Sequence, residues 1–339
     1  MTLSTAAAPV PPTTPAPGPR SRVGALLAER PVIALTGLLV VLYLVTGALE
    51  PSLFTVGGVR SILLLACPLA IFAASQTLCM LTGGIDLSVA LTANLAAYIA
   101  ANRSGDGTLS ALLLALFVGL LVGAINGVGV GVFKVNPLIM TLGMASVLLG
   151  VVTVGLIGDG FLAGSTRLLP VVRSVGSGTL IGPIPANTVV WLVLGGLIVL
   201  GLSRSGLGRM IYAVGDNPVA CRLAGVRVWQ VLLAVYVLAG LFAAIGGLLF
   251  SGISGSVGPD QTNAYLLPSV AAAVIGGTSI LGGSGGYTGT ILGALILTVL
   301  GRLLLSLDTT EAVRQVLYGL IVLVLAWVYV KVSGQRAAA

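Results

Sequence analysis

Long apolar segments are the feature of this sequence that most restricts its fold. Most of them are about 20 residues long, which is the length an α-helix needs to cross a hydrocarbon layer of roughly 30 Å. We place ten such segments near residues 31–49, 61–81, 87–101, 109–132, 136–158, 187–203, 229–252, 265–281, 286–305 and 312–331. Because lipid offers no partner to backbone polar groups, such segments must be helical. The pattern predicts an all-α polytopic membrane protein with about ten transmembrane helices.

The composition excludes several classes of function. Of the 339 residues, 57% are hydrophobic and 7% are charged, whereas soluble domains carry about 25% charged residues. The chain has no histidine, which excludes a histidine metal site and a serine–histidine catalytic pair. It has no G-x-x-x-x-G-K-[ST] motif and so no P-loop for ATP. We expect no enzyme activity and no metal or cofactor in this chain. We attribute its net charge of +7 to the placement of loops, not to nucleic-acid binding.

The distribution of charge predicts the orientation of the chain. Residues 1–30 are rich in Ala, Pro and Thr, so we expect a disordered cytoplasmic tail before a transmembrane domain at 31–332. With ten spans and the N-terminus inside, ten basic and three acidic residues face the cytoplasm, and six of each face outward. This agrees with the positive-inside rule. The short tail at 333–339 is then cytoplasmic too.

The segment at about 204–228 carries the densest cluster of positive charge, with four arginines and one aspartate, Asp216. Apolar residues at helical spacing stand on both sides of a turn signal, Gly215-Asp216-Asn217-Pro218. Such a turn favours a positive φ at one position, which Gly215 accepts at least cost. Two short helices joined by this turn would form a docking surface for another protein. A solvated connector that follows the positive-inside rule is the alternative.

Two of the predicted spans carry glycines that are four residues apart. The fourth span has Gly119, Gly123, Gly127 and Gly131, and the ninth has Gly285, Gly289 and Gly293. This spacing places small residues on one helix face, where a second helix can approach closely. We interpret both sets as helix-packing surfaces.

The third predicted span is unusually short. Its fifteen or so residues cover roughly 22 Å, less than the hydrocarbon core of a bilayer. Gly83-Gly84 breaks the chain before it, with Asp86 at the expected N-cap and Ser88 in the expected first turn. The helix could start inside the membrane and face a substrate pathway, as interrupted helices do in other transporters. Alternatively, Asp86 only caps a short helix at the cytoplasmic surface. The candidate pathway residues are Gly83, Gly84, Asp86, Ser88, Asn126 and Asn136.

Four blocks of the sequence form a recognisable set. They read LTGGIDLSV (81–89), INGVGVGVFKVNPLIMTLGM (125–144), GRMIYAVGDNPVACRLAGV (208–226) and AAAVIGGTSILGGSGGYTGTILGALI (271–296). In this order they resemble the membrane-spanning permease subunits of bacterial ABC sugar importers of the ribose/xylose type. The resemblance implies a type II ABC importer-like permease fold in the bacterial inner membrane, in contact with lipid.

The resemblance also implies partners. In that family the central segment is a coupling loop, which docks on a separate cytoplasmic ATPase subunit that binds the ATP. The residues that match its motif here are Gly208, Arg209, Tyr212, Ala213, Gly215, Asn217, Pro218 and Gly225. An extracytoplasmic binding protein would deliver the substrate, and a second permease copy or a paralogue would complete the pathway.

The chain departs from the family pattern at a few positions, which leaves its substrate open. Ala90-Leu91 replaces a usual Gly-Ser pair, Leu266 and Pro268 replace acidic residues, and Ala224 replaces a serine. A monosaccharide or similar polyol is the expected solute. A non-sugar, such as a branched-chain amino acid, urea or a signalling molecule, is an alternative within the same fold. An ion-coupled secondary transporter is a second alternative, which the scarcity of ionisable residues in the spans disfavours.

Overall fold

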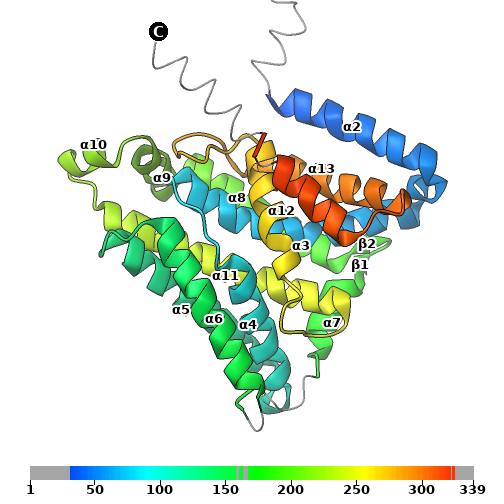
Figure 1. Cartoon of the computed structure of the whole chain (residues 1–339), viewed down its shortest axis with the longest axis horizontal. Coiled ribbons are helices and arrows are strands. Elements are labelled where there is room, and N and C mark those ends of the chain that lie inside the picture. Colours follow the sequence, from blue (N-terminus) through cyan, green and yellow to red (C-terminus); the bar gives the residue numbers. More distant parts are fainter. Residues whose placement is uncertain (1–30, 158–159, 163–166, 322, 325–339) are drawn as a thin grey trace, which may run out of the picture.

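A computed structural model describes residues 31–157, 160–162, 167–321 and 323–324 of the protein. The tails predicted at 1–30 and 333–339 lie outside these described residues. Within them the fold is helical (Figure 1), apart from an antiparallel pair of short strands, β1 (Thr179–Ile181) and β2 (Ile184–Pro185).

Seven of the described helices are long and apolar enough to cross a membrane. They are α2 (Pro31–Leu49), α3 (Val56–Leu81), α5 (Thr108–Gly131), α6 (Pro137–Leu156), α8 (Ala186–Arg204), α11 (Val228–Ser254) and α13 (Tyr287–Ser306). Two further predicted spans form the shorter helices α4 (Val89–Asn102) and α12 (Leu266–Ile275), and residues 311–321 are also helical. These helices confirm an all-α architecture with several spans, while the crossing of the membrane by about ten helices stays a prediction.

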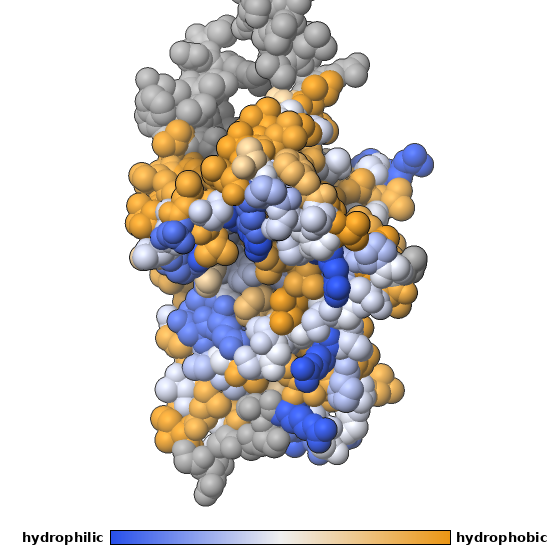
Figure 2. Space-filling view, turned by 90° about the vertical axis from the view of Figure 1, so that its right-hand side faces the viewer, coloured by the Kyte–Doolittle hydropathy of each residue, from blue (hydrophilic) through white to orange (hydrophobic). Residues whose placement is uncertain are grey.

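Short elements occupy the two ends of the molecule. α9 (Gly206–Asp216) and α10 (Pro218–Leu223) lie at one end, and β1 and β2 lie at the other, as Figure 1 shows. The remaining short elements are α7 (Pro170–Ser177), η1 (Pro51–Phe54), η2 (Ser104–Asp106) and η3 (Asn263–Tyr265). Figure 2 looks onto the end with the strands, where hydrophilic residues gather in the middle and hydrophobic residues lie along the upper and left edges. A polar end with an apolar periphery suits a protein whose sides face lipid.

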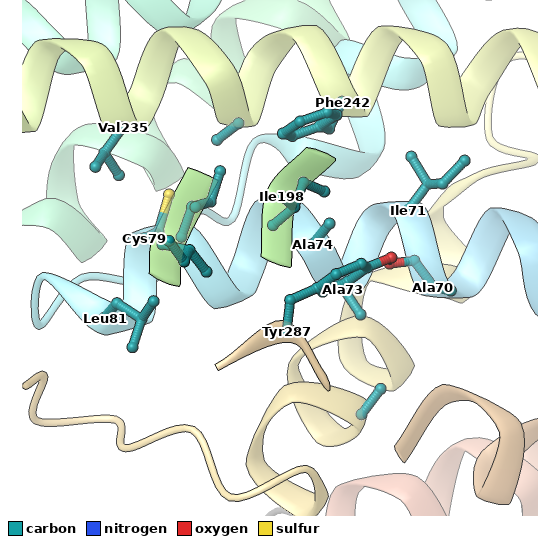
Figure 3. Packing of buried hydrophobic residues seen from close by; sticks show 14 of the residues in the cluster. Ala70, Ile71, Ala73, Ala74, Cys79, Leu81, Ile198, Val235, Phe242 and Tyr287 are labelled. Atoms are coloured by element: carbon teal, nitrogen blue, oxygen red, sulfur yellow. The ribbon is translucent and has the colours of Figure 1, made fainter. Parts of the chain in front are cut away.

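α3 lies at the centre of the fold. All its residues from Ala66 to Leu81 are buried, many of them alanines that allow neighbouring helices to come close. Figure 3 shows Phe242 of α11 on one side of this helix and Tyr287 of α13 on the other. The Tyr287 hydroxyl donates to the carbonyl of Ala70 at 2.9 Å and accepts from the indole N–H of Trp191 at 3.0 Å. These bonds join α3, α13 and α8 without leaving the buried hydroxyl unpaired.

An ion pair attaches the peripheral helix α2 to this core. Glu50 directly follows α2, and its carboxylate accepts from the guanidinium of Arg302 on α13, with 2.8 Å between Nε and Oε2. This hydrogen-bonded contact lowers the pKa of Glu50 below its ordinary value. The Tyr43 hydroxyl adds a bond to the carbonyl of Leu53 at 2.7 Å.

Four of the five glycines of α5 face the backbone of α11. These glycines are Gly119, Gly123, Gly127 and Gly131. A Cβ atom at Gly119 would lie 2.5 Å from the carbonyl oxygen of Gly240, and one at Gly123 would be closer still to the carbonyl oxygen of Tyr236. Among the described elements, no other pair of helices packs over so long a contact as α5 and α11.

The prediction that three glycines of the ninth span share one helix face is wrong for Gly285. Gly289 and Gly293 face the backbone of α12, at Gly276 and Ala272. Gly285 instead precedes α13 and has a φ of +115°, which favours glycine. The reason is that the chain is still turning here, so that α13 begins only at Tyr287.

The α5–α11 packing predicts opposite effects for two glycine-to-alanine substitutions. Gly123→Ala should lower the melting temperature of the purified protein, because overpacking against a backbone costs about 1–3 kcal/mol. Gly196→Ala on α8 is the matched control, since nothing lies within 4 Å of the added Cβ. It should leave the melting temperature unchanged or raise it slightly, because alanine favours a helix. Equal melting temperatures for the two variants would contradict this packing.

Candidate functional site

The 204–228 segment folds into two short helices because it contains an N-cap residue for each of them, Ser205 and Asn217. The side-chain oxygen of Ser205 accepts from the amide of Gly208 at 2.9 Å and starts α9. Asn217 separates the two helices, and its side-chain oxygen accepts from two amides in the first turn of α10 at 3.0 and 2.9 Å. Pro218 takes the first position of α10, where a missing amide hydrogen costs nothing.

The reason given for Gly215 from the sequence is wrong. Gly215 belongs to the last turn of α9, and its φ is not positive. The positive φ of the segment occurs at Gly225, between α10 and α11, at +82°. A Cβ atom at Gly215 would instead overlap the carbonyl oxygen of Leu81 and lie 2.6 Å from the amide nitrogen of Gly283. The position requires glycine because two other parts of the chain touch its backbone.

We call this contact the α9 seat, formed by Leu81, Gly215 and Gly283. The amide of Gly283 donates to the carbonyl of Leu81 at 3.0 Å, directly beside Gly215. One turn earlier on α9, the Tyr212 hydroxyl donates to the carbonyl of Gly285 at 3.0 Å. α9 therefore contacts the end of α3, directly before the loop at residues 82–88, and the loop at residues 276–286 before α13.

Each loop leads to one of the short apolar helices. Residues 82–88 precede α4, which has 14 residues, and residues 276–286 follow α12, which has 10 residues. Neither helix is long enough to cross a bilayer core of about 30 Å by itself. The α9 seat thus lies beside the loops that lead to these two helices.

The other residues of the coupling motif divide into buried and exposed positions. Gly208 is buried, and a Cβ atom there would lie 2.5 Å from the carbonyl oxygen of Gly201. Arg209 and Ala213 are exposed on α9. α10 has no buried residue, and its Leu223 side chain is 87% exposed. The two helices therefore present a surface of arginines and apolar side chains that no described part of the chain covers.

A buried polar network holds the loop between α3 and α4. Asp86 is only 2% exposed, and its Oδ1 accepts from the amide and the hydroxyl of Ser88, at 2.9 and 2.6 Å. The side-chain amide of Asn126 on α5 donates to the Ser88 hydroxyl at 2.9 Å. Gln76 of α3 pairs with the backbone of Asp86 in both directions, at 2.7 and 3.2 Å. The Thr141 hydroxyl of α6 accepts from the next amide in the loop at 3.1 Å.

The N-cap of α4 lies two residues later than the sequence predicts. Ser88 stands at the N-cap and not in the first turn, and its side chain makes no capping bond. Asp86 precedes the cap by two residues and accepts the Ser88 amide from there. Since Gln76 fixes the backbone of Asp86 against α3, the carboxylate cannot reach further into α4.

Two buried atoms beside this network have no hydrogen-bond partner among the described residues. They are Oδ1 of Asn126 and the hydroxyl of Tyr236 on α11. Both side chains are fully buried. A Cβ atom at Gly84 would lie 2.5 Å from the Tyr236 hydroxyl, which places that hydroxyl against the loop. Buried polar atoms normally find a partner, so this is a place where a water molecule or a hydroxyl-rich solute could bind.

The structure brings together only part of the predicted pathway. Asp86, Ser88 and Asn126 share the network, and Gly84 adjoins it. Asn136 does not, because it is exposed and its side chain caps α6 by accepting from the amide of Leu138 at 2.9 Å. Gly83 supplies the turn after α3, with a φ of +77°.

Sequence reasoning missed three members of this region. These are Gln76, Thr141 and Tyr236. Each is a polar residue within a predicted apolar span, which was the only available signal. That signal does not say which loop the side chain meets.

Comparison with known proteins places the chain among transport permeases. Residues 58–326 match a family model described as branched-chain amino acid transport system / permease component. The chain is 34% identical over 304 residues to the ribose import permease protein RbsC of Escherichia coli strain K12, covering 88% of this chain and 92% of the relative. It is 34% identical over 268 residues to the fructose import permease protein FrcC of Rhizobium meliloti, covering 75% and 72%.

A Gram-positive relative agrees with these two. The chain is 32% identical over 289 residues to the ribose import permease protein RbsC of Bacillus subtilis strain 168, covering 84% of this chain and 88% of the relative. No solved structure matches the chain. The family model begins within the first turn of α3 and continues to residue 326, so it includes the α9 seat and the polar network. The chain therefore belongs to this family of transport permeases, which are not enzymes, and within it to the ribose-type ABC sugar permeases.

Proposed function

We propose that this protein is the membrane-spanning subunit of an ATP-driven importer for a monosaccharide or similar polyol. The observation that carries the proposal is the α9 seat. It joins the exposed helix pair α9 and α10 to the end of α3, where the loop to α4 begins, and to the loop that follows α12. A soluble ATPase that moves α9 would displace both loops together, because backbone contacts without side chains between them leave little room for independent movement.

The exposed surface of α9 and α10 suits an ATPase subunit as partner. Val219 is 55% and Leu223 87% exposed, and both belong to a helix with no buried residue. Apolar side chains among arginines on a rigid support are typical of protein docking sites. The ATP would be bound by that partner.

A second copy of the chain, or a paralogue, completes the pathway in this proposal. α6 supports it, since Gly143 and Gly150 share a face of this helix and nothing lies within 4 Å of a Cβ atom at either position. Ser146 and Thr153 continue the same face, and both are exposed. Small and hydroxylated residues are common where membrane helices meet. An extracytoplasmic binding protein would deliver the solute at the end of the molecule opposite to α9 and α10.

The relatives and the polar network support a sugar as substrate. The named relatives import ribose and fructose, and amides and hydroxyls such as those of Asn126 and Ser88 are groups that bind polyols. A branched-chain amino acid is the second candidate, because the description of the family model names that solute.

Uptake by proteoliposomes tests the proposal. They would contain this chain with its ATPase and its binding protein, and the solute would be a radiolabelled monosaccharide. Uptake should require ATP hydrolysis, and Gly215→Ala should reduce its rate roughly tenfold or more, since the clash costs about 1–3 kcal/mol. Gly206→Ala, at the other end of α9, should transport normally because its Cβ has only the flexible end of Arg209 near it, at 3.9 Å.

Two outcomes would contradict this proposal. Uptake driven by an ion gradient without ATP would show a secondary transporter. Normal ATP-driven uptake by Gly215→Ala would show that the α9 seat does not couple ATP hydrolysis to transport. Competition by unlabelled leucine, but not by ribose or fructose, would favour the amino acid as substrate.

The proposed orientation places both termini and the 204–228 segment in the cytoplasm of a bacterial cell, as the charge distribution indicates. A Leu223→Cys variant tests it, since this position is 87% exposed whereas Cys67 and Cys79 are fully buried. Cys221 is half-buried and would be replaced by serine. A membrane-impermeant maleimide should label the variant in inside-out vesicles and not in intact cells. The reverse labelling would invert the topology.

The geometry of Asp86 predicts different outcomes for two substitutions. Asp86→Asn should assemble and transport at close to the normal rate, because an amide oxygen can accept from both donors of Ser88 as Oδ1 does. Asp86→Ala should lose most uptake, since both donors would then be buried without an acceptor. Uptake rate and membrane abundance would be measured together. A well-assembled Asp86→Asn protein without uptake would show that the charge itself acts in the pathway.

A further inference from the structure

A cavity of about 460 Å³ lies beside the 82–88 loop and borders the polar network at Gly84 and Tyr236. Its walls come from the turn between α5 and α6, from α10, from the start of α11 and from the loop after α3. Three of the residues that line it are cations, Lys134, Arg222 and Arg227, and none is acidic.

These three cations have no carboxylate partner in the part of the chain that the structure describes. The ion pairs there involve Arg103, Arg302 and Arg314 instead. Arg222 and Arg227 belong to the 204–228 segment, whereas Lys134 comes from the turn between α5 and α6, so the fold brings two distant segments together. Lys134 also has a φ of +57°, a left-handed conformation that is uncommon for a residue with a side chain. Like charges repel when they converge, so the arrangement favours an anion in the cavity.

The surroundings of the cavity indicate where the anion comes from. Phe133, next to Lys134, is 73% exposed, and Ile139 at the start of α6 is 68% exposed. Trp229 lines the cavity and is itself 42% exposed. Exposed apolar helix faces that meet basic residues and a tryptophan are typical of the boundary between lipid tails and headgroups. An anion that enters here can keep an apolar portion against α5 and α6.

A residue with an unused hydrogen-bond donor also lines the cavity. This residue is Tyr236, whose buried hydroxyl has no partner among the described residues. Guanidinium and ammonium groups bind phosphate oxygens strongly, and a phenol hydroxyl can complete such a site.

We propose that this cavity binds the phosphate headgroup of an anionic phospholipid from the adjoining leaflet. Lys134, Arg222 and Arg227 contact the phosphate, and the acyl chains lie along the exposed faces of α5 and α6. Basic pockets between membrane helices bind such headgroups through this chemistry. Because Arg222 on α10 and Gly84 in the 82–88 loop both line the cavity, the bound lipid connects α10 to the loop that carries Asp86.

Lipid titration of the full-length protein tests the proposal. The purified protein in neutral detergent is titrated with phosphatidylglycerol or phosphatidylcholine, and its melting temperature and the lipid retained in native mass spectrometry are measured. Phosphatidylglycerol should raise the melting temperature and be retained, while phosphatidylcholine should do neither. The variant Lys134→Gln/Arg227→Gln should need more phosphatidylglycerol for the same shift, by about fivefold for each cation removed.

The matched control is Arg204→Gln/Arg209→Gln, which removes two charges from the same end of the molecule but outside the cavity. It should titrate like the wild type. If both variants lose the response to phosphatidylglycerol equally, general surface charge and not this cavity binds the lipid, which would contradict the proposal. If the double variant does not fold, Arg227→Gln alone should show about a fivefold loss, and no loss there would also overturn it.

Two further arms distinguish other occupants. Glycerol 3-phosphate has the phosphate but no acyl chains, so it should stabilise the protein far less than the lipid does. Equal stabilisation would assign the cavity to a soluble phosphate compound. A double variant that titrates normally with lipid but no longer copurifies with the ATPase would assign the cavity to an acidic side chain of that subunit.

Discussion

Close contact between backbones is the interaction on which the rest of this structure depends. Two helices in lipid gain little from the hydrophobic effect when they meet, so their association depends on van der Waals packing and on hydrogen bonds. The chain meets this constraint with small residues at the contacts. Gly119 and Gly123 lie on the backbone of α11, Gly289 lies on that of α12, and Gly215 lies between Leu81 and Gly283.

The interior contains two groups of buried polar residues, which differ in how completely they are hydrogen-bonded. Around Tyr287 each hydrogen bond is made, from Trp191 to the phenol and from the phenol to α3, and the packing there joins three long helices. Around Asp86 the network is less complete. Asn126 and Tyr236 each have a buried oxygen atom that forms no hydrogen bond with the described residues. A fully satisfied network favours one arrangement, whereas an incomplete one can exchange partners at smaller cost. The second group is therefore better suited to movement.

The loop at 82–88 is where the functional features of the chain meet. One side of it contacts the α9 seat, another lines the basic cavity through Thr82 and Gly84, and its interior holds the network of Asp86. The side chains that contact this loop come from α3, α5, α6 and α11. A force on α9, an anion in the cavity and a solute near Asn126 would all act on the same short segment.

The sequence by itself determined the properties that depend on neighbouring residues. The length of each apolar segment decided where the long helices run, and Asn217-Pro218 decided that α9 and α10 are separate helices, because a cap needs only the next few residues. The spacing of Gly119 and Gly123 indicated a packed helix face, and the motif blocks indicated the family. Asp86 and Ser88 were placed at the start of a short helix because Gly83-Gly84 interrupts the chain just before them.

The tertiary structure decided what depends on residues far apart in the chain. Gly215 was singled out for its φ, yet it is glycine because Leu81 and Gly283 approach it, and nothing near Gly215 in the sequence specifies them. Gln76, Thr141 and Tyr236 looked like isolated polar residues in apolar helices until packing brought them to one loop. Lys134, Arg222 and Arg227 likewise became one site only through folding. Helical periodicity tells which side chains share a face, but the helix that covers that face is selected by packing over the whole bundle.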